Sequence, residues 1–109
     1  MTTLDANAGY VVIINTFSVD PAKAEELLSV LIEGTEQGVS KRPGFISANW
    51  HMAKDKRHVT NYAQWRSEAD IDAMMADPDV RRHLQKADGL ADRVEPIFYE
   101  LRATFKSSE

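Results

Sequence analysis

The apolar positions of this chain change between strand-like and helix-like spacing. Residues 10–19 are dense in β-branched side chains and almost continuously apolar, which is typical of a strand buried on both faces. Asp20 and Pro21 then supply a helix cap and a first-turn proline, and apolar residues recur at helical spacing. These residues are Ala24, Leu27, Leu28 and Leu31. The pattern predicts a strand over residues 10–19 and a helix that ends within residues 38–44.

The middle of the chain has the pattern of a β-hairpin. Phe45–Met52 and His58–Trp65 are both strand-like, and the charged segment 54–57 between them is typical of a turn. Two strands joined by so short a turn pair antiparallel. We therefore expect these two strands to be neighbours in one sheet.

A second helix and a last strand are expected in the remaining third of the chain. Ser67 followed by Asp70 resembles a capping box and predicts a helix that begins here. The Asp-Pro pair at residues 77–78 should break or re-cap this helix, which then continues to residues 88–89. Residues 97–105 alternate loosely between apolar and polar and predict the last strand.

The predicted order of elements is β-α-β-β-α-β, an α+β fold of the ferredoxin-like type. In this fold both helices cover one face of a four-stranded antiparallel sheet and leave the other face open. Along the first strand Val11 and Ile13 point to one face, while Val12 and Ile14 point to the other. The open face is thus also apolar, and a homodimer that packs sheet on sheet is the expected way to cover it.

Composition narrows the class of protein. The 109 residues are expected to form one domain over residues 1–109, with flexible segments at 1–9 and 106–109. The absence of cysteine excludes thiol nucleophiles and thiolate metal sites and makes the cytoplasm the default location. A net charge of -4 argues against nucleic acid as a partner. The apolar run 11–14 is too short for a membrane span.

The third predicted strand carries the residues with the clearest chemical potential. Asn61, Ala63 and Trp65 share one face, and Asn61 and Trp65 are about 13 Å apart at ~3.3 Å per residue. The first strand is a neighbour in this topology, so Asn15 can lie close to Asn61. Two amides and an indole N–H would then converge on one pocket. Equally, a strand Trp is often plain core and a strand Asn is often satisfied by a turn or bulge, so the pattern leaves both interpretations open.

The histidines do not predict a metal site. His51 and His58 have no partner ligand at close spacing, and His83 has only Asp79 one helical turn before it. Surface positions or hydrogen-bond networks are the expected role of all three. Gly-rich phosphate loops, nucleophile elbows and paired-carboxylate motifs are absent from the sequence.

The segment Asn61-Tyr-Ala-Gln-Trp-Arg-Ser-Glu68, with Pro43-Gly-Phe-Ile-Ser-Ala48 and residues 17–20, resembles the antibiotic biosynthesis monooxygenase family. The resemblance covers about residues 9–105 and is greatest to the branch that oxidises polyketide anthrones to anthraquinones. It implies a homodimeric α+β barrel with a pocket between sheet and helices in each subunit. It also implies oxygenation of a small aromatic substrate by O₂ without flavin, metal or other cofactor.

The resemblance also implies roles for individual residues. An Asn and a Trp spaced as Asn61 and Trp65 are the residues assigned to catalysis in the anthrone branch, and a first-strand Asn, matched by Asn15, contributes in some members. A Tyr or Arg assigned to proton handling in other members has no clear counterpart, because Ile71 and Leu84 fall at about those positions.

Substrate chemistry explains how such a protein works without a cofactor. An electron-rich phenolate or enolate can pass one electron to O₂, after which the two radicals combine to a peroxide that loses water. Neutral donors such as Asn61 and Trp65 would stabilise the anion in a dry pocket. The pocket walls are expected from the apolar residues of the two helices, which are otherwise plain core. These are Leu27, Leu31, Ile71, Met74 and Met75.

Two other functions are compatible with the same sequence. Heme-degrading relatives share this fold and use a second-helix His as the iron ligand, and His83 falls about two residues early for that role. A dimeric module that binds a small aromatic ligand without turnover is the non-enzymatic alternative.

Overall fold

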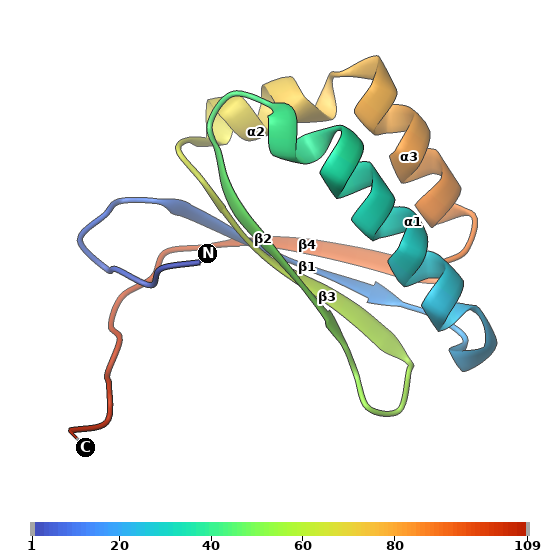
Figure 1. Ribbon diagram of the computed structural model, residues 1–109, viewed down its shortest axis with the longest axis horizontal. Coiled ribbons are helices and arrows are strands. Elements are labelled where there is room, and N and C mark those ends of the chain that lie inside the picture. The colour runs from blue at the N-terminus through green and yellow to red at the C-terminus, as the bar shows by residue number, and fades with distance from the viewer. Residues whose placement is uncertain (1, 109) are drawn as a thin grey trace.

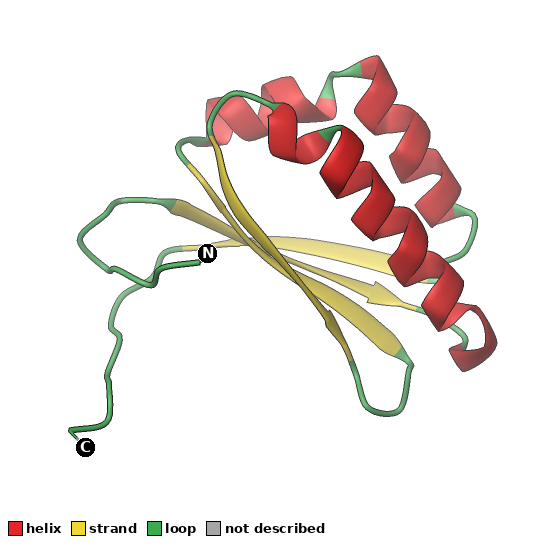
Figure 2. Ribbon diagram, viewed as in Figure 1, coloured by secondary structure: helices red, strands yellow, loops and turns green. Residues whose placement is uncertain are grey.

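The structure, a computed structural model, describes residues 2–108. The chain forms a four-stranded antiparallel sheet with its helices on one face (Figure 1, Figure 2). The strands are β1 (Val11–Ser18), β2 (Phe45–Met52), β3 (His58–Trp65) and β4 (Arg93–Tyr99), in the order β2-β3-β1-β4. The helices are α1 (Ala24–Gln37), α2 (Glu68–Met75) and α3 (Pro78–Asp88), with 3₁₀ turns over Pro21–Lys23 and Val39–Lys41. This arrangement confirms the predicted ferredoxin-like fold.

Both Asp-Pro pairs begin helical segments, as the sequence predicts. Asp20 Oδ1 accepts a hydrogen bond from the backbone N–H of Ala22 at the start of the first 3₁₀ turn. Asp77 Oδ1 accepts from the N–H groups of Asp79 and Val80 at 2.9 and 3.1 Å. Each aspartate satisfies donors that have no partner within the helix, and the proline supplies a preset φ. The second predicted helix is therefore divided into α2 and α3.

The core lies between the sheet and the helices, which Figure 1 shows stacked on one side of the strands. One buried cluster joins Phe17 of β1 and Val59 of β3 to Leu27 of α1. A second joins Ala63 and Trp65 of β3 to Ile71 of α2. Helices α1 and α3 also pack against each other. The apolar helical stripes predicted from the sequence thus face the sheet.

The N-terminal arm lies against the face of the sheet that the helices leave open. Gln64 Nε2 donates to the carbonyl oxygen of Thr3 at 2.8 Å, and Gln64 Oε1 accepts from Ser47 Oγ at 2.9 Å. Thr2 Oγ1 donates to Asn49 Oδ1 at 2.7 Å. These bonds leave Gln64 only 1% exposed, although it points away from the helices. The flexibility expected of residues 1–9 stays a prediction, but the arm from residue 2 onward has defined contacts with the sheet.

The last strand differs from its prediction. β4 occupies Arg93–Tyr99 rather than residues 97–105, because it pairs with β1 and its pairing reaches only from Ser18 back to Val12. Only Val11 of β1 lies beyond the last pair, Val12 with Tyr99, so the strand ends there. The strand begins at Arg93, before its predicted start, although Pro96 has no N–H to donate to the hydrogen bonds between strands. This proline is tolerated here because β4 is an edge strand. Within residues 2–108, no helix has the length and apolarity needed to cross a bilayer.

Gly44 provides a test of the turn that enters β2. Its φ is +84°, and a Cβ atom at this position would lie 2.3 Å from Asp70 Oδ2. We predict that Gly44→Ala lowers the free energy of unfolding by about 1–3 kcal/mol, because both the backbone and the Asp70 carboxylate must move. Urea denaturation measures this change. Gly89→Ala is the matched control, since Gly89 has φ of -69° and only van der Waals neighbours. Equal loss in both variants would contradict the prediction.

Candidate active site

An apolar cavity of about 90 Å³ lies between the helix-facing side of the sheet and the three helices. The strands β1, β2 and β3 form its floor, and α1, α2 and α3 supply its walls. Of the wall residues predicted from the sequence, Leu31, Met74 and Met75 line the cavity, whereas Leu27 and Ile71 belong to the buried clusters. The three predicted site residues, Asn15, Asn61 and Trp65, all line it.

The register of the sheet brings the two asparagines together. Asn15 of β1 is paired directly with Asn61 of β3, and Asn61 is paired with Trp50 of β2. Directly paired residues project from the same face with Cβ atoms about 4.5–5.5 Å apart. The expectation that Asn15 lies close to Asn61 is thus met. Ala63, on the same face, leaves space between this row and Trp65.

The Asn61 amide has a defined orientation. Its Oδ1 accepts a hydrogen bond from the backbone N–H of Asn49 at 3.0 Å. A backbone N–H can only donate, so the side-chain atom that faces it must be the oxygen. The amide nitrogen, with its two N–H groups, has no partner among residues 2–108. Asn61 is therefore partly satisfied within β2 and β3, and it retains a donor that a ligand can use.

Asn15 presents the complementary group. Its Oδ1 is buried and has no hydrogen-bond partner among the described residues. A buried acceptor left in this state costs about 1–3 kcal/mol, a cost that a ligand donor would remove. Asn15 and Asn61 thus place a free acceptor and a free donor on adjacent strands of the cavity floor.

The two tryptophans of the cavity differ in what their N–H groups do. Trp50 Nε1 donates to Thr35 Oγ1 at 3.0 Å, and Thr35 Oγ1 donates in turn to the Leu31 carbonyl at 2.8 Å. Trp65 is 1% exposed and meets the ring of Phe45 edge to face, with centroids 5.4 Å apart. Its N–H has no hydrogen-bond partner within residues 2–108. The packing therefore fixes the Trp65 ring and leaves its donor free.

Among the cavity residues that the sequence did not predict, two carry ring nitrogens. Trp50 lies in the same row as Asn61, which the alternation of Ala48 and Trp50 along β2 could have indicated. His83, expected at the surface or in a network, lies on α3 and lines the cavity. A Cβ at Gly34 of α1 would lie 3.0 Å from the His83 Cβ, so the glycine allows this close approach. Contacts between helices of this kind are not visible in the spacing of either helix alone.

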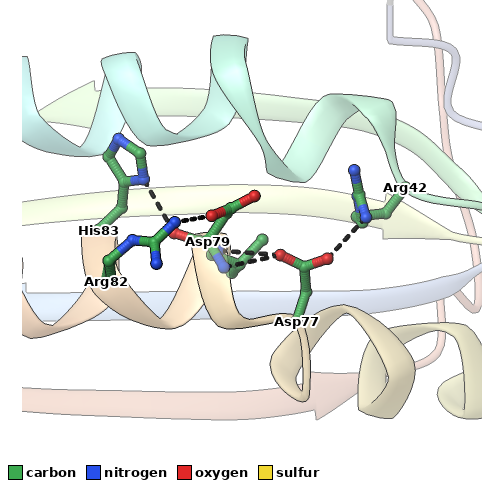
Figure 3. Close-up of polar contacts among 6 residues, drawn as sticks. Arg42, Asp77, Asp79, Arg82 and His83 are labelled. Atoms are coloured by element: carbon green, nitrogen blue, oxygen red, sulfur yellow. Dashed lines mark hydrogen bonds and ion pairs between the residues drawn. The ribbon is translucent and has the colours of Figure 1, made fainter.

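Figure 3 shows how α3 is anchored. Arg42, in the segment before β2, pairs with the Asp77 carboxylate at 2.6 Å, and the same carboxylate caps α3. His83 Nδ1 lies 3.1 Å from the backbone oxygen of Asp79, and the Asp79 carboxylate pairs with Arg82. Within residues 2–108, no three His, Asp or Glu side chains gather as they would around a metal ion.

These features describe a binding cavity for a flat, largely apolar molecule with oxygen substituents. Neutral donors and one neutral acceptor project from its floor, and none of the lining side chains is a carboxylate, lysine or arginine. A small α+β subunit with a cavity between sheet and helices is the architecture that the resemblance to antibiotic biosynthesis monooxygenases implies. The chain belongs to the antibiotic biosynthesis monooxygenase family, which matches residues 10–86.

Individual relatives agree with this assignment. Tetracenomycin-F1 monooxygenase of Streptomyces glaucescens is 40% identical over 105 residues, which cover 96% of this chain and 93% of the relative. The monooxygenase from the gene ActVA-Orf6 of Streptomyces coelicolor, solved in complex with the ligand Nanaomycin D, is 28% identical with a TM-score of 0.82. That match covers 96% of this chain and 100% of the other.

SnoaB of Streptomyces nogalater, a cofactor-independent oxygenase, has the same fold, with 21% identity and a TM-score of 0.73. The match covers 92% of this chain and 100% of SnoaB. The family and the monooxygenase class predicted from the sequence are thus confirmed.

The junction that follows Trp65 is held by a charged pair. Both Arg66 nitrogens Nε and Nη2 donate to the Asp70 carboxylate at 2.9 Å, and Ser67 Oγ donates to it at 2.8 Å. The Asp70 N–H returns a bond to Ser67 Oγ at 3.2 Å. The Arg66 guanidinium, together with Ser67, lowers the pKa of Asp70. This network starts α2 directly beside the Trp65 ring.

The lowered pKa of Asp70 has a defined effect on stability. The pKa of Asp in an unfolded chain is about 4. Ionised Asp70 therefore adds its full contribution to the free energy of unfolding above that pH. The contribution is lost as the pH falls through the lower pKa of the folded state. We predict that Asp70→Asn melts at a lower temperature than the wild type at pH 7, with the difference closing in acid. Thermal melts from pH 7 to pH 2 test this. Asp72→Asn, at an exposed position of α2, is the control. A gap that is independent of pH would contradict the role of the ion pair.

Proposed function

We propose that this protein is a cofactor-independent monooxygenase that oxidises an anthrone or hydroquinone ring of an aromatic polyketide to a quinone with O₂. The proposal is supported by family membership and by the relatives named above. The observation that carries it is the floor of the cavity, where the Asn61 amide and the Trp65 indole retain free N–H groups in apolar surroundings. Asn15, Asn61 and Trp65 are the proposed catalytic residues.

The reaction needs only an electron-rich substrate and a site that favours its anion. For an anthrone, one molecule of O₂ is consumed; one oxygen atom becomes the new carbonyl and the other leaves as water. An enolate or phenolate transfers an electron to O₂, and the resulting radicals combine at carbon to form the peroxide. Donors from Asn61 and Trp65 stabilise the negative oxygen, a contribution of about 3–4 kcal/mol for one such group in a dry site.

Asn15 orients the same substrate. Its free Oδ1 accepts a hydrogen bond from a phenolic O–H next to the reacting ring. The adjacent Asn61 N–H then faces the neighbouring oxygen, which becomes the anion. A substrate with two oxygens on one edge therefore satisfies both amides at once.

Entry of a tricyclic substrate requires the cavity to widen. Its volume of about 90 Å³ is below the roughly 300 Å³ of the smaller ligand pockets in proteins. Met74 and Met75 lie at the α2 end of the cavity, and Met75 is 48% exposed. Unbranched methionine side chains change rotamer easily. We infer that these two side chains move aside for the substrate.

A homodimer completes the proposed enzyme. The edge strand β4 exposes Ile97, Phe98 and Tyr99 at 47%, 48% and 46%, an unusual run of large apolar groups for a free surface. A second copy packed sheet on sheet would cover Ile97 and Tyr99 and close the α+β barrel. The cytoplasmic location expected from the sequence stays a prediction.

We predict that the purified protein oxidises a model anthrone in air and that Asn61→Ala and Trp65→Phe each reduce kcat/KM by about 100-fold. Phenylalanine keeps the ring packing against Phe45 and removes only the N–H. Quinone absorbance and oxygen uptake measure the rate, in parallel with and without a chelator. Asn49→Ala, on the open face, is the control and should change the rate little.

Three outcomes would contradict the proposed function. Full activity in both variants would exclude the role of the two donors, and loss of activity with the chelator would show dependence on a metal. Tight binding of anthrones and quinols with no turnover would favour the ligand-binding module instead.

The dimer is tested separately. We predict a mass of twice the 12.3 kDa chain by light scattering. Ile97→Lys should shift this toward the monomer, because a charge would be buried between the sheets. Ile32→Lys, at a similarly exposed position of α1, should leave the dimer intact. A monomeric wild type would refute the dimer without affecting the fold.

A further inference from the structure

His83 is the one titratable side chain among the described residues that line the cavity. The others are apolar groups, the amides of Asn15 and Asn61, the indoles and the Thr35 hydroxyl. Amides and indoles donate hydrogen bonds but do not take up protons near neutral pH. The proposed reaction requires a proton to leave the substrate, and His83 is the lining side chain that can accept it.

The hydrogen bond to Asp79 determines which nitrogen of His83 is available. The Asp79 backbone oxygen, 3.1 Å from Nδ1, can only accept, so Nδ1 carries the proton in the neutral ring. Nε2 then has the lone pair. No residue within 2–108 is hydrogen bonded to it. The ring is therefore set as a proton acceptor at Nε2.

The groups that surround His83 leave its Nε2 lone pair without a competing charged partner. From α1 the ring is faced by the uncharged Gly34 and Thr35, and the cavity floor beneath it is also uncharged. On its own helix, Asp79 and Arg82 pair with each other, and Lys86 lies one turn further along. The bond of Arg42 to the Asp77 cap fixes the start of the helix. Figure 3 shows His83 pointing from α3 toward α1.

We propose that His83 Nε2 is the group that takes the proton from the substrate, an assignment that rests on the proposed function. With an anthrone, the ring methylene loses a proton to Nε2 and its electron pair forms the enolate. The enolate gives one electron to O₂, and the substrate radical and superoxide combine to form a C–O bond. The peroxide anion takes the proton back from the imidazolium and becomes a hydroperoxide.

The second half of the reaction uses the same nitrogen. Nε2 removes the remaining hydrogen of that carbon as a proton, the C–H electrons form the new C=O bond, and the O–O bond breaks. Hydroxide leaves and receives the proton from the imidazolium as water. The substrate has then lost two hydrogens and gained one oxygen, and His83 is again neutral.

His83→Asn is the sharpest test. Its side-chain amide nitrogen can replace Nδ1 in the bond to the Asp79 oxygen, while nothing replaces Nε2. We expect kcat/KM for anthrone oxidation to fall about 100-fold or more, in the range of general acid–base catalysis. The wild-type rate should fall in acid, because a protonated Nε2 can no longer accept a proton from the substrate. That acid limb should be absent from the variant, and added imidazole should restore part of its rate.

Controls separate this inference from the proposed function. His58→Gln, at an exposed position of β3, should retain the wild-type rate and acid limb. His83→Gln is the second variant should Asn impair folding, which circular dichroism reports. An active wild type with an equally active His83→Asn would overturn the inference alone. An active His83→Asn that keeps the acid limb would do the same.

Two further outcomes concern the enzyme as a whole. A wild type inactive toward every anthrone and quinol would overturn both proposals. A stoichiometric Soret shift with hemin that His83→Asn abolishes would identify the imidazole as an iron ligand and overturn its role as proton acceptor.

Discussion

The pairing register between β1 and β3 is the constraint on which the site depends. Asn15 opposite Asn61 puts both amides on the helix-covered face, and the same register brings Val11 opposite Trp65. Because side chains alternate along a strand, a slip of β1 by one residue would send Asn15 to the open face, away from Asn61. The continuous apolarity of β1 tolerates such a slip better than an alternating strand. Phe17, buried opposite Val59, helps to exclude it.

The unpartnered polar groups of the cavity lower the stability of the fold. The Asn15 oxygen is buried without a partner, and the Asn61 amide nitrogen and the Trp65 N–H also lack one among the described residues. An apolar residue at position 15 would remove the buried acceptor and is expected to stabilise the subunit. Unsatisfied polar groups of this kind occur where structure is held for a ligand rather than for folding. The surrounding buried clusters offset the cost.

Much of the fold could be predicted from the sequence because its signals are local. The bounds of β2 and β3, the two Asp-Pro helix starts and the shared face of Asn61 and Trp65 follow from spacing alone. Their assembly into one cavity needed the ferredoxin-like topology. The β4 bounds failed because the end of that strand is decided by its partner.

Other features depend on residues far apart in sequence. The bond from the Asn49 N–H to Asn61 arises in a β2 strand whose register shifts between Phe45 and Ser47. His83 enters the cavity because Gly34, on another helix, leaves room for it. The contact of Thr3 with the open face depends on Gln64, whose motif gave no indication of that contact. No periodicity within one element reports such contacts.

The hydrogen bond between Trp50 and Thr35 limits what the cavity can offer a ligand. Two indoles border the cavity, yet the Trp50 N–H is already committed to helix α1. Trp50 therefore presents ring surface, while Asn61, paired directly beside it, keeps its free N–H groups. The commitment of one tryptophan to the scaffold thus leaves Asn61 and Trp65 as the N–H donors on which the proposed function depends.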